Sequence, residues 1–577
     1  MSRSPRWSLF ALLAIAAIVF TACSGAASPS PSASSGAASA PAASAASSAP
    51  FTATAYPESG EAPCGVAPYT GTFKKITAVD AKTVRFDLCS PDVAFLSKIA
   101  FSSFAINDSD YLKKAAADGS IVEKPNGTGP YMLKEWARGD HITMVANPNY
   151  TGPNKAKSPT LIIKWSKEAA QRLVELQSGS VDGIDNVGPE DFDKVKGDSS
   201  LKLIERPALN IMYIGMSNAF KPFDNEKVRQ AVAMGIDRDR IVKNFYPAGS
   251  EVAAKFTPCA IPGGCEGDDW YAFDAPKAKQ LLADAGFPNG FKTVIHLRDV
   301  VRSYLPNPTQ VATDIQAQLK ANLNIDATID VQESTTYIDN SNAGKLDGIH
   351  LLGWGADYPD VTNFLDVHFG AGATKQFGKH YSDIEAALSK GAQTPDQAGR
   401  NAAYADANNL IKQHVPMIPV AHGGSAVAYR ADVADSHSSP LGNELFSVMT
   451  PGDRQQFVFQ QGAEPGGLYC ADETDGESLR VCEQMTEALY GYKIGGLDAE
   501  PALATECKPN TELTTWTCTL RDGVKFADGS TLDANDVVTT FAAQWDAKNP
   551  LHKARTGDFT YFSTLFGGFL NPPPPSS

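Results

Sequence analysis

Alternating apolar and polar positions predict several strands in this chain. Three segments show the alternation: Val84-Phe86-Leu88, Phe457-Phe459 and Trp516-Cys518-Leu520. A period of two residues is typical of a strand with one buried face. After the third segment, Asp522-Gly523 supplies a turn signal and Val524 and Phe526 continue the alternation, so this stretch predicts a hairpin.

Helices are predicted where a capping residue precedes apolar residues spaced along one face. The expected caps are Asp224, Asp237, Asp274 and Asp533. Gly286 ends the helix that Asp274 opens. Strands and helices alternate irregularly, and no long Pro/Gly linker interrupts the folded part. The pattern therefore predicts a mixed α/β protein whose lobes are built from discontinuous segments.

The N-terminal sequence is typical of an export signal. Arg3 and Arg6 precede an apolar run over 9–22, which is too short for a comfortable membrane span and suits the core of a signal peptide. The sequence Phe20-Thr21-Ala22-Cys23 resembles a bacterial lipobox, although Phe20 stands where leucine is preferred. We expect residues 1–22 to be removed and Cys23 to be lipidated. An ordinary secretory signal with an incidental cysteine is the alternative.

A low-complexity segment follows Cys23. Every residue from Ser24 to Pro50 is Ala, Ser, Pro or Gly, so no large apolar side chain is available for burial. We interpret residues 23–52 as a flexible tether between the lipid and the folded protein.

Composition narrows the functional classes. The 577 residues are 43% hydrophobic and 20% charged, as in ordinary globular proteins, and the net charge is −15. An anionic chain without a cluster of five or more Lys/Arg argues against nucleic-acid binding. The only apolar stretch long enough to matter is the N-terminal run over 9–22, which excludes a polytopic membrane protein.

The eight cysteines after Cys23 suggest disulfides in an exported chain. Sequence alone allows many pairings, and we favour local ones, with the last left by elimination. The favoured pairs are Cys259–Cys265, Cys470–Cys482, Cys507–Cys518 and Cys64–Cys89. A zinc site is the alternative, but no Cys-x₂-Cys spacing occurs, so we expect no metal.

Catalytic motifs are not evident in the sequence. The chain has no His-Glu-x-x-His, Gly-x-Ser-x-Gly or post-strand Gly-x-Gly-x-x-Gly. Residues 372–379 resemble a phosphate loop, but the glycine spacing is wrong and His380 replaces the required Ser/Thr. We therefore expect neither an enzyme nor a cofactor.

The most informative segment is 353–360, Gly-Trp-Gly-Ala-Asp-Tyr-Pro-Asp, which follows an apolar strand over 349–352. An aspartate at a strand end can point into a binding site and hold an ammonium group by a charge-assisted hydrogen bond. The simpler interpretation is that Asp357 caps a turn while Trp354 is part of the core.

With this segment the chain resembles a known family, the extracytoplasmic solute-binding proteins of ABC transporters that carry oligopeptides, dipeptides or nickel chelates. Trp354 and Asp357 match its Trp-x-x-Asp, whose Asp pairs with the α-ammonium of a bound peptide. Other matching stretches are 127–131 (Gly-Thr-Gly-Pro-Tyr), 177–182, 223–238, 277–286 and 520–526 (Leu-Arg-Asp-Gly-Val-Lys-Phe). The resemblance covers roughly residues 65 to 570 and implies an α/β, two-lobed periplasmic-binding-protein fold (class II, large three-subdomain type).

The order of these stretches departs from the family. Residues 455–570 resemble the family's N-terminal part, and its usual second portion begins near Tyr69, so the chain reads as circularly permuted. The joint would be 450–453, Thr-Pro-Gly-Asp, and the new ends would flank a loop between Phe569 and Gly71. The alternative is a truncated second binding protein appended to the first.

The resemblance also implies a domain plan. It places the first part of lobe 1 at 53–230, lobe 2 at 231–420, the rest of lobe 1 at 421–570 and a disordered tail at 571–577. Two crossings between the lobes would act as a hinge, so ligand binding would favour closure.

Further ligand contacts are expected around Asp357 and on the facing lobe. The expected set is Trp354, Gly355, Ala356, Asp357, Tyr358, Thr474, Asp475, Gly476, Asn210 and Tyr213. Some oligopeptide binders carry an arginine three residues before the tryptophan, where this chain has Leu351, so the length and charge of the ligand stay open.

The function expected is that of a lipid-anchored, extracytoplasmic monomer that captures a short peptide and delivers it to the permease of an ABC importer. A nickel chelate, haem or an oligosaccharide is the alternative ligand, and an exported hydrolase is the alternative from another class.

Overall fold

The computed structural model describes residues 51–572. The expected signal peptide, the lipidation of Cys23, nearly all of the tether and most of the proline tail lie outside these residues. Asn571, the first residue of that tail, donates to both carboxylate oxygens of Asp546 at 3.0 Å. Within the described part, none of the helices combines the length and the apolar character that a membrane crossing needs.

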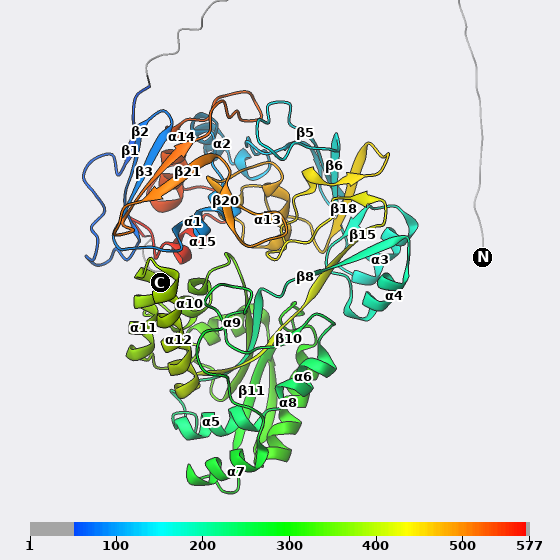
Figure 1. Cartoon of the computed structure of the whole chain (residues 1–577), viewed down its shortest axis with the longest axis vertical. Helices are drawn as coiled ribbons and strands as arrows, with labels where there is room; N and C mark the ends of the chain where they lie inside the picture. The colour runs from blue at the N-terminus through cyan, green and yellow to red at the C-terminus, as the bar shows by residue number, and fades with distance from the viewer. Residues whose placement is uncertain (1–50, 573–577) are drawn as a thin grey trace, which may run out of the picture. The chain divides into compact units, whose positions relative to one another are not determined.

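Two sheets form what we call the first lobe (Figure 1). The seven-stranded sheet has the order β4 (Tyr131–Ala137), β5 (His141–Ala146), β6 (Thr160–Trp165), β18 (Gln456–Gln461), β7 (Gly183–Ile184), β15 (Ser425–Arg430) and β8 (Leu201–Arg206). The five-stranded sheet has the order β1 (Ala55–Tyr56), β2 (Phe73–Asp80), β3 (Thr83–Leu88), β22 (Thr515–Leu520) and β21 (Ala504–Pro509). Both sheets therefore combine segments from the two ends of the chain.

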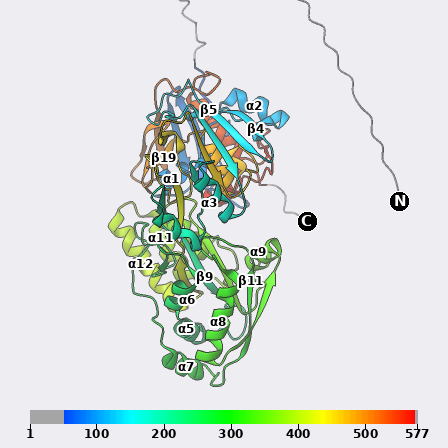
Figure 2. The same ribbon diagram turned by 90° about the vertical axis from the view of Figure 1, so that its right-hand side faces the viewer.

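The second lobe is built on a six-stranded sheet. Its order is β10 (Glu251–Val252), β14 (Met417–His422), β9 (Asn210–Met216), β13 (Ile349–Gly355), β11 (Lys292–Arg298) and β12 (Asp326–Gln332). The accompanying helices are α5 (Glu226–Gly235), α6 (Arg238–Phe245), α7 (Ala275–Asp284), α8 (Pro308–Leu323), α9 (Ser334–Asn342), α10 (Leu365–Phe369), α11 (Ser382–Gln393) and α12 (Gln397–His414). Figure 2 shows α5, α6 and α8 flanking the strands β9 and β11.

The helices of the first lobe come from both ends of the chain as well. They are α1 (Phe95–Ile99), α2 (Ser109–Asp118), α3 (Ala169–Ser178), α4 (Phe192–Gly197), α13 (Gly476–Glu483), α14 (Ala534–Trp545) and α15 (Thr560–Leu565). Two short strand pairs complete it, β16 (Val433–Ala434) with β17 (Thr450–Pro451), and β19 (Tyr490–Tyr492) with β20 (Ala499–Pro501). Helix α14 packs against β2 and β3, so the C-terminal helix covers N-terminal strands (Figure 1).

The chain passes between the lobes twice. The first crossing, 207–209, joins β8 to β9, and the second, 423–424, joins β15 to β14. Strands β9 and β14 pair antiparallel in one sheet, and β8 and β15 pair antiparallel in the other. The structure thus places the first crossing before β9 rather than at residue 231, because β9 and α5 belong to the second lobe.

Several local predictions are confirmed and two are wrong. The Asp237, Asp274 and Asp533 side chains cap α6, α7 and α14. Asn225, not Asp224, caps α5 by accepting from the backbone N–H of Lys227. Residues 524–526 do not pair with β22 in a hairpin. They turn back on 530–532, while β22 pairs with β21 and β3.

The four disulfides follow the pairing that the spacing favoured. They are Cys64–Cys89, Cys259–Cys265, Cys470–Cys482 and Cys507–Cys518. Three of them lie in the first lobe and one lies in the second. Each closes a short stretch of chain, so each constrains local structure rather than linking the lobes.

Candidate functional site

The end of β13 places Asp357 where the lobes meet. Strand β13 lies between β9 and β11, and the chain turns directly after it. A Cβ added to Gly355 would have no heavy atom within 4 Å, so this strand end faces open space. The side chain of Asn363 fixes Asp357 twice. Its Oδ1 accepts from the Asp357 backbone N–H at 2.9 Å, and its Nδ2 donates to Asp357 Oδ2 at 3.0 Å.

Asp357 carries a carboxylate without a cationic partner. The residue is half-buried, and the desolvation of the carboxyl group raises its pKa to about 6. Hydrogen bonds from Asn363 and Tyr561 oppose this rise but do not cancel it. No lysine, arginine or histidine of the described chain is among the groups that act on it. A desolvated carboxylate in this state is stabilised by any cation that reaches it.

Tyr561 joins Asp357 to the facing lobe. It lies in the first turn of α15, and its hydroxyl reaches the Asp357 carboxylate as well as the backbone carbonyl of Thr474, 3.4 Å away. Burial and the negative charge of Asp357 raise the pKa of Tyr561, so the phenol stays protonated. The structure therefore brings Asp357 and Thr474 to one place, which we call the interlobe site (Asp357, Tyr561 and Thr474).

The residues after Thr474 form the start of α13. Asp475 accepts from the backbone N–H of Ser478 at 2.8 Å and caps the helix, so its carboxylate is committed to α13. A Cβ at Gly476 would meet no heavy atom within 4 Å, as at Gly355. Each of these two glycines therefore faces open space.

The other residues around Asp357 mainly hold the strand end in place. Trp354 Nε1 lies 3.4 Å from Asn363 Oδ1, and the Trp354 ring meets His368 edge-on at 5.1 Å. The backbone N–H of Ala356 donates to the Leu209 carbonyl. Tyr358 is buried in the core of the first lobe, so this side chain of the second lobe anchors the contact between them.

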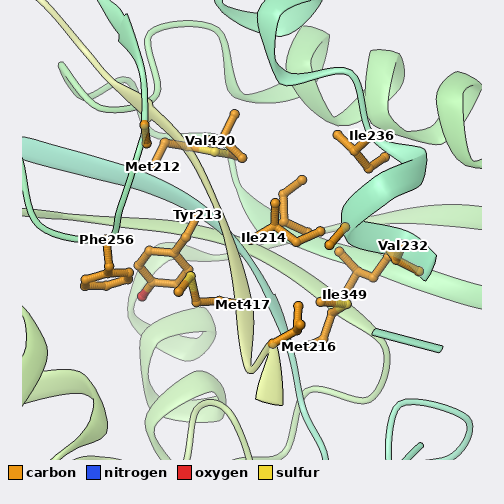
Figure 3. Packing of buried hydrophobic residues seen from close by; sticks show 14 of the residues in the cluster. Met212, Tyr213, Ile214, Met216, Val232, Ile236, Phe256, Ile349, Met417 and Val420 are labelled. Atoms are coloured by element: carbon orange, nitrogen blue, oxygen red, sulfur yellow. The ribbon is translucent and has the colours of Figure 1, made fainter. Parts of the chain in front are cut away.

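Asn210 and Tyr213 lie away from Asp357. Asn210 lies at the crossings between the lobes: its side chain donates to the Gly423 carbonyl and accepts from the Gly423 N–H, both at 2.7 Å. Tyr213 is buried in the core of the second lobe beside Phe256 and Met417 (Figure 3), and its hydroxyl donates to Gln376 at 2.6 Å.

Sequence reasoning missed Tyr561 and Asn363. Asn363 is six residues after Asp357, and only its fold back onto the strand end reveals its role. Tyr561 lies in a segment without a recognisable pattern. Arg298 ends β11, the parallel neighbour of β13, so the two strands present their carboxyl ends at the same sheet edge. Arg298 donates to Ser334 and Tyr304.

A separate cavity of about 130 Å³ lies within the first lobe. Its lining includes Glu483, Glu487, Tyr490 and Tyr492, and none of the expected ligand residues lines it. Burial raises the pKa of Glu483 to about 8 and that of Glu487 to about 7. We locate the candidate site at Asp357 because the unpaired charge and the residues of both lobes converge there.

The fold and the site define an α/β solute-binding protein with two lobes. The sequence model of the bacterial extracellular solute-binding proteins, family 5, matches residues 29–376 and 498–564. The chain belongs to this family of ABC transporter solute-binding proteins. Members of the family are extracytoplasmic binding proteins rather than enzymes.

Relatives agree with this assignment. The chain is 30% identical over 381 residues to the Heme-binding protein A of Haemophilus influenzae, covering 65% of this chain and 69% of the relative. It is 28% identical over 379 residues to the dipeptide-binding protein of Escherichia coli, covering 64% and 70%. It is 30% identical over 384 residues to di/tripeptide-binding protein 1 of Pseudomonas aeruginosa, covering 66% and 71%.

Solved structures support the fold. HbpA2 from Haemophilus parasuis has a TM-score of 0.60 at 30% identity, covering 66% of this chain and 76% of that chain. The dipeptide-binding protein from Pseudoalteromonas sp. SM9913, in complex with Met-Leu, has a TM-score of 0.56 at 26% identity, covering 64% and 74%.

Proposed function

We propose that this protein captures a short peptide by its free amino terminus at the interlobe site and delivers it to the permease of an ABC importer. The observation that carries the proposal is the Asp357 carboxylate, which is desolvated and has no cationic partner in the described chain. A peptide ammonium would supply the missing charge and donate to the carboxylate oxygen that Asn363 leaves free.

The surroundings of Asp357 suit a ligand with two opposite charges. Arg298 lies at the same sheet edge, and no ion pair of the described chain involves it. Arg302, on the loop that follows β11, is exposed, and its side chain donates only to the neighbouring Val301 carbonyl. One of these guanidinium groups could receive the peptide's carboxylate, whereas Asp357 receives its amine.

Haem is the second candidate, because a relative is named for haem binding. Its propionates are anionic, and the nearest unpaired group at the interlobe site is a carboxylate. Like charges in a desolvated site repel strongly, so the site favours an ammonium over a propionate.

Calorimetric titration of the purified protein tests the proposal. We expect a free tripeptide to bind, its N-acetylated form to bind at least about a hundredfold more weakly, and Asp357→Asn to lose the preference for the free amine. Asp326→Asn, which alters an exposed acid paired with Lys320 in the same lobe, is the control and should bind normally. An Asp357→Asn variant that keeps the full preference for the free over the N-acetylated peptide, or binding of haemin alone, would contradict the assignment.

We further propose that Cys23 carries a lipid and that the mature protein is a monomer held at the outer face of the cell membrane. Two acyl chains give stable membrane attachment where one gives only weak attachment. The Ala/Ser/Pro/Gly composition after Cys23 supports a tether that spaces the folded part from the bilayer. Labelling cells with a radioactive fatty acid should mark the wild-type protein and leave Cys23→Ser unlabelled. Size-exclusion chromatography of the soluble form should give a monomer.

We also propose that the chain is a circular permutation of the usual family order. Its two lobes are divided at the crossings 207–209 and 423–424. Strand β18 runs parallel between β6 and β7, and β22 pairs with β3, so residues 455–570 fill places in sheets begun by residues 51–206. An appended second protein would instead build sheets of its own. The two ends that the permutation would create are adjacent, since the Thr72 N–H donates to the Phe566 carbonyl.

A further inference from the structure

We propose that the ion pair between Glu473 and Arg555 is a positioning device that holds Tyr561 against Asp357 and Thr474 at the edge of the ligand site. The proposal rests on the proposed function, since it concerns the same site. Neither residue touches Asp357 in the structure, so their role would be to place the residue that does.

Glu473 is a fully buried carboxylate that depends on Arg555. The arginine donates from Nε to Oε1 at 3.0 Å and from Nη2 to Oε2 at 2.5 Å, which is a two-pronged contact. A buried carboxylate that loses such a partner is strongly destabilised. The pair therefore fixes the position of residue 555 relative to the loop before α13.

The neighbouring acid clamps the next two residues of the same segment. Asp472 accepts from the Thr556 backbone N–H at 2.7 Å, from the Thr556 hydroxyl at 2.6 Å and from the Gly557 N–H at 3.0 Å. Asp472 and Glu473 together bind three consecutive residues, 555–557. The segment that leads into α15 is thus attached to the loop before α13 at several points.

Both ends of this attachment lead directly to the ligand site. Thr474 follows Glu473, and its carbonyl lies 3.4 Å from the Tyr561 hydroxyl. Tyr561 comes four residues after Gly557, and its ring packs edge-on against Phe101 at 4.7 Å. The pair therefore sets the spacing between the two elements that meet at Asp357. The disulfide Cys470–Cys482 closes the same loop from the other side.

The pair also explains why two glycines precede it. A Cβ at Gly467 would lie 2.2 Å from Glu473 Oε1, and one at Gly466 would lie 3.1 Å from the Arg555 guanidinium. The backbone at 466–467 thus packs directly against the ion pair, and any side chain there would push it out of place. Such close packing of the backbone is expected if the Glu473–Arg555 pair has to be held in a fixed position.

The test is a titration of the Asp357 carboxyl group by carbon NMR in ligand-free protein labelled at aspartate, with the signal assigned by its loss in Asp357→Asn. Tyr492 and Tyr561 are the titratable groups that interact with Asp357. The Tyr561 hydrogen bond lowers the pKa of Asp357. Tyr561→Phe should therefore raise that pKa, and Arg555→Met should raise it by a similar amount. The double variant should show no further rise.

Peptide affinity is the second readout. We expect Arg555→Met to weaken tripeptide binding roughly tenfold, Arg555→Lys to restore most of it, and neither change to add to the effect of Tyr561→Phe. Lys157→Met, which breaks an exposed ion pair with Asp435 in the same lobe, is the matched control and should alter neither readout.

Three results would overturn the proposal: an unchanged Asp357 pKa in Arg555→Met, an unchanged pKa in Tyr561→Phe, or additive effects in the double variant. If Arg555→Met does not fold, Glu473→Met combined with Arg555→Met removes the pair without leaving a buried charge, and the same predictions apply to it. Because the NMR titration needs no ligand, its outcome is independent of whether the protein binds peptides.

Discussion

At the scale of single residues, Asp357 has a property that suits binding but opposes stability. Its carboxyl group loses protons less readily in the folded protein than in the unfolded chain, because the surrounding protein removes water from it. The charged form that a ligand needs is therefore the form that the empty protein tolerates least. Such a residue is more easily understood as part of a binding site than as part of the core.

The pH dependence of stability tests this conflict. Between about pH 4 and pH 6 the folded protein holds a proton on Asp357 that the unfolded chain has released, so the free energy of unfolding falls as the pH rises through this range. We expect Asp357→Asn to stabilise the empty protein by about 1–2 kcal/mol above pH 6 and to have no stabilising effect below pH 4. Urea titrations at pH 4 and pH 7.5 measure the difference. Stabilisation of equal size at both values would argue against a desolvated carboxylate.

The pH dependence of binding is a separate prediction at the same residue. Peptide affinity should be greatest near pH 7 and should fall as the pH is lowered through about 6, the pKa of Asp357 in the empty protein, because the carboxylate takes up a proton. It should fall again above pH 8 as the peptide amine loses its proton. Calorimetry from pH 4.5 to pH 9 measures the profile. Asp357→Asn should lack the acidic limb and keep the basic one; a variant that kept both would mean that another group titrates.

How far the site could be predicted depends on where its residues lie in the sequence. Asp357 follows a recognisable strand end, so local pattern and family resemblance both indicated it. Tyr561 lies some 200 residues away and enters the site only because the C-terminal segment folds against the second lobe. Tyr213 was expected at the site because, with Asn210, it lies where the chain enters the region between the lobes. Tyr213 lies in β9, a central strand whose residues are all buried. The sequence of such a strand does not indicate which of its two faces is turned toward a ligand.

At the scale of elements, the two crossings between the lobes are tightly packed. The Asn210 side chain joins both crossings by bonding the Gly423 backbone in both directions. A Cβ at Gly423 would lie 1.9 Å from the Ser303 carbonyl oxygen, so no other residue fits without a backbone shift. The second crossing is thus held by close backbone approach and is not a loose connection.

Gly423→Ala should therefore be strongly destabilising, by roughly 2–3 kcal/mol, because the clash is with backbone and cannot be relieved by a rotamer change. Gly197→Ala is the matched control. Nothing lies within 4 Å of the added atom there, and the residue ends α4, so the change should be neutral or slightly stabilising. Thermal melts of both variants check the contrast. Equal melting temperatures would show that the crossing can yield.

Prediction of the elements succeeded where the signal was local and failed where a partner was remote. The caps at Asp237, Asp274 and Asp533 depend on a few adjacent residues, and the structure has them. The expected hairpin failed because the segment after Gly523 has its own turn partner at 530–532. Strand β22 instead pairs with β3, more than 400 residues earlier, and no local pattern encodes that choice.

At the scale of the whole described chain, a buried charge network ties three distant segments together. Glu444, on the segment that leads to the expected joint, is paired with Arg206 at 2.6 Å and with Arg480 at 3.2 Å. Asp185 pairs with the same two arginines at 2.9 and 3.1 Å. The two arginines keep the pKa of Glu444 below its usual value despite full burial. The network therefore links residues of the first part, the joint and the C-terminal part.

Glu444→Ala should cost about 3–5 kcal/mol, because it leaves two buried arginines short of one counter-charge. Asp435→Ala, in the same segment but paired only with the exposed Lys157, should cost less than about 1 kcal/mol. Chemical denaturation of the two variants gives the comparison. A small loss in Glu444→Ala would mean that the joint contributes little to the first lobe.

Reversing the proposed permutation is the strictest test of how the chain is organised. A variant would begin at Asp453, run to Leu570, pass through a short linker to Gly71 and end at Thr450. The three large sheets would keep every strand except β1, which lies at an edge; β17, in the two-stranded pair with β16, would also be cut. Because the linked ends are adjacent in the structure, closing them costs little chain entropy.

We expect the variant to fold and to bind the same peptides within about threefold of the original affinity. Peptide mapping should show that it retains the pairs Cys259–Cys265, Cys470–Cys482 and Cys507–Cys518. A control cut within β18, which lies in the middle of its sheet, should not fold. Failure of the reversed chain together with folding of the control would mean that the present order is required by the fold, and that residues 455–570 are not a displaced N-terminal part.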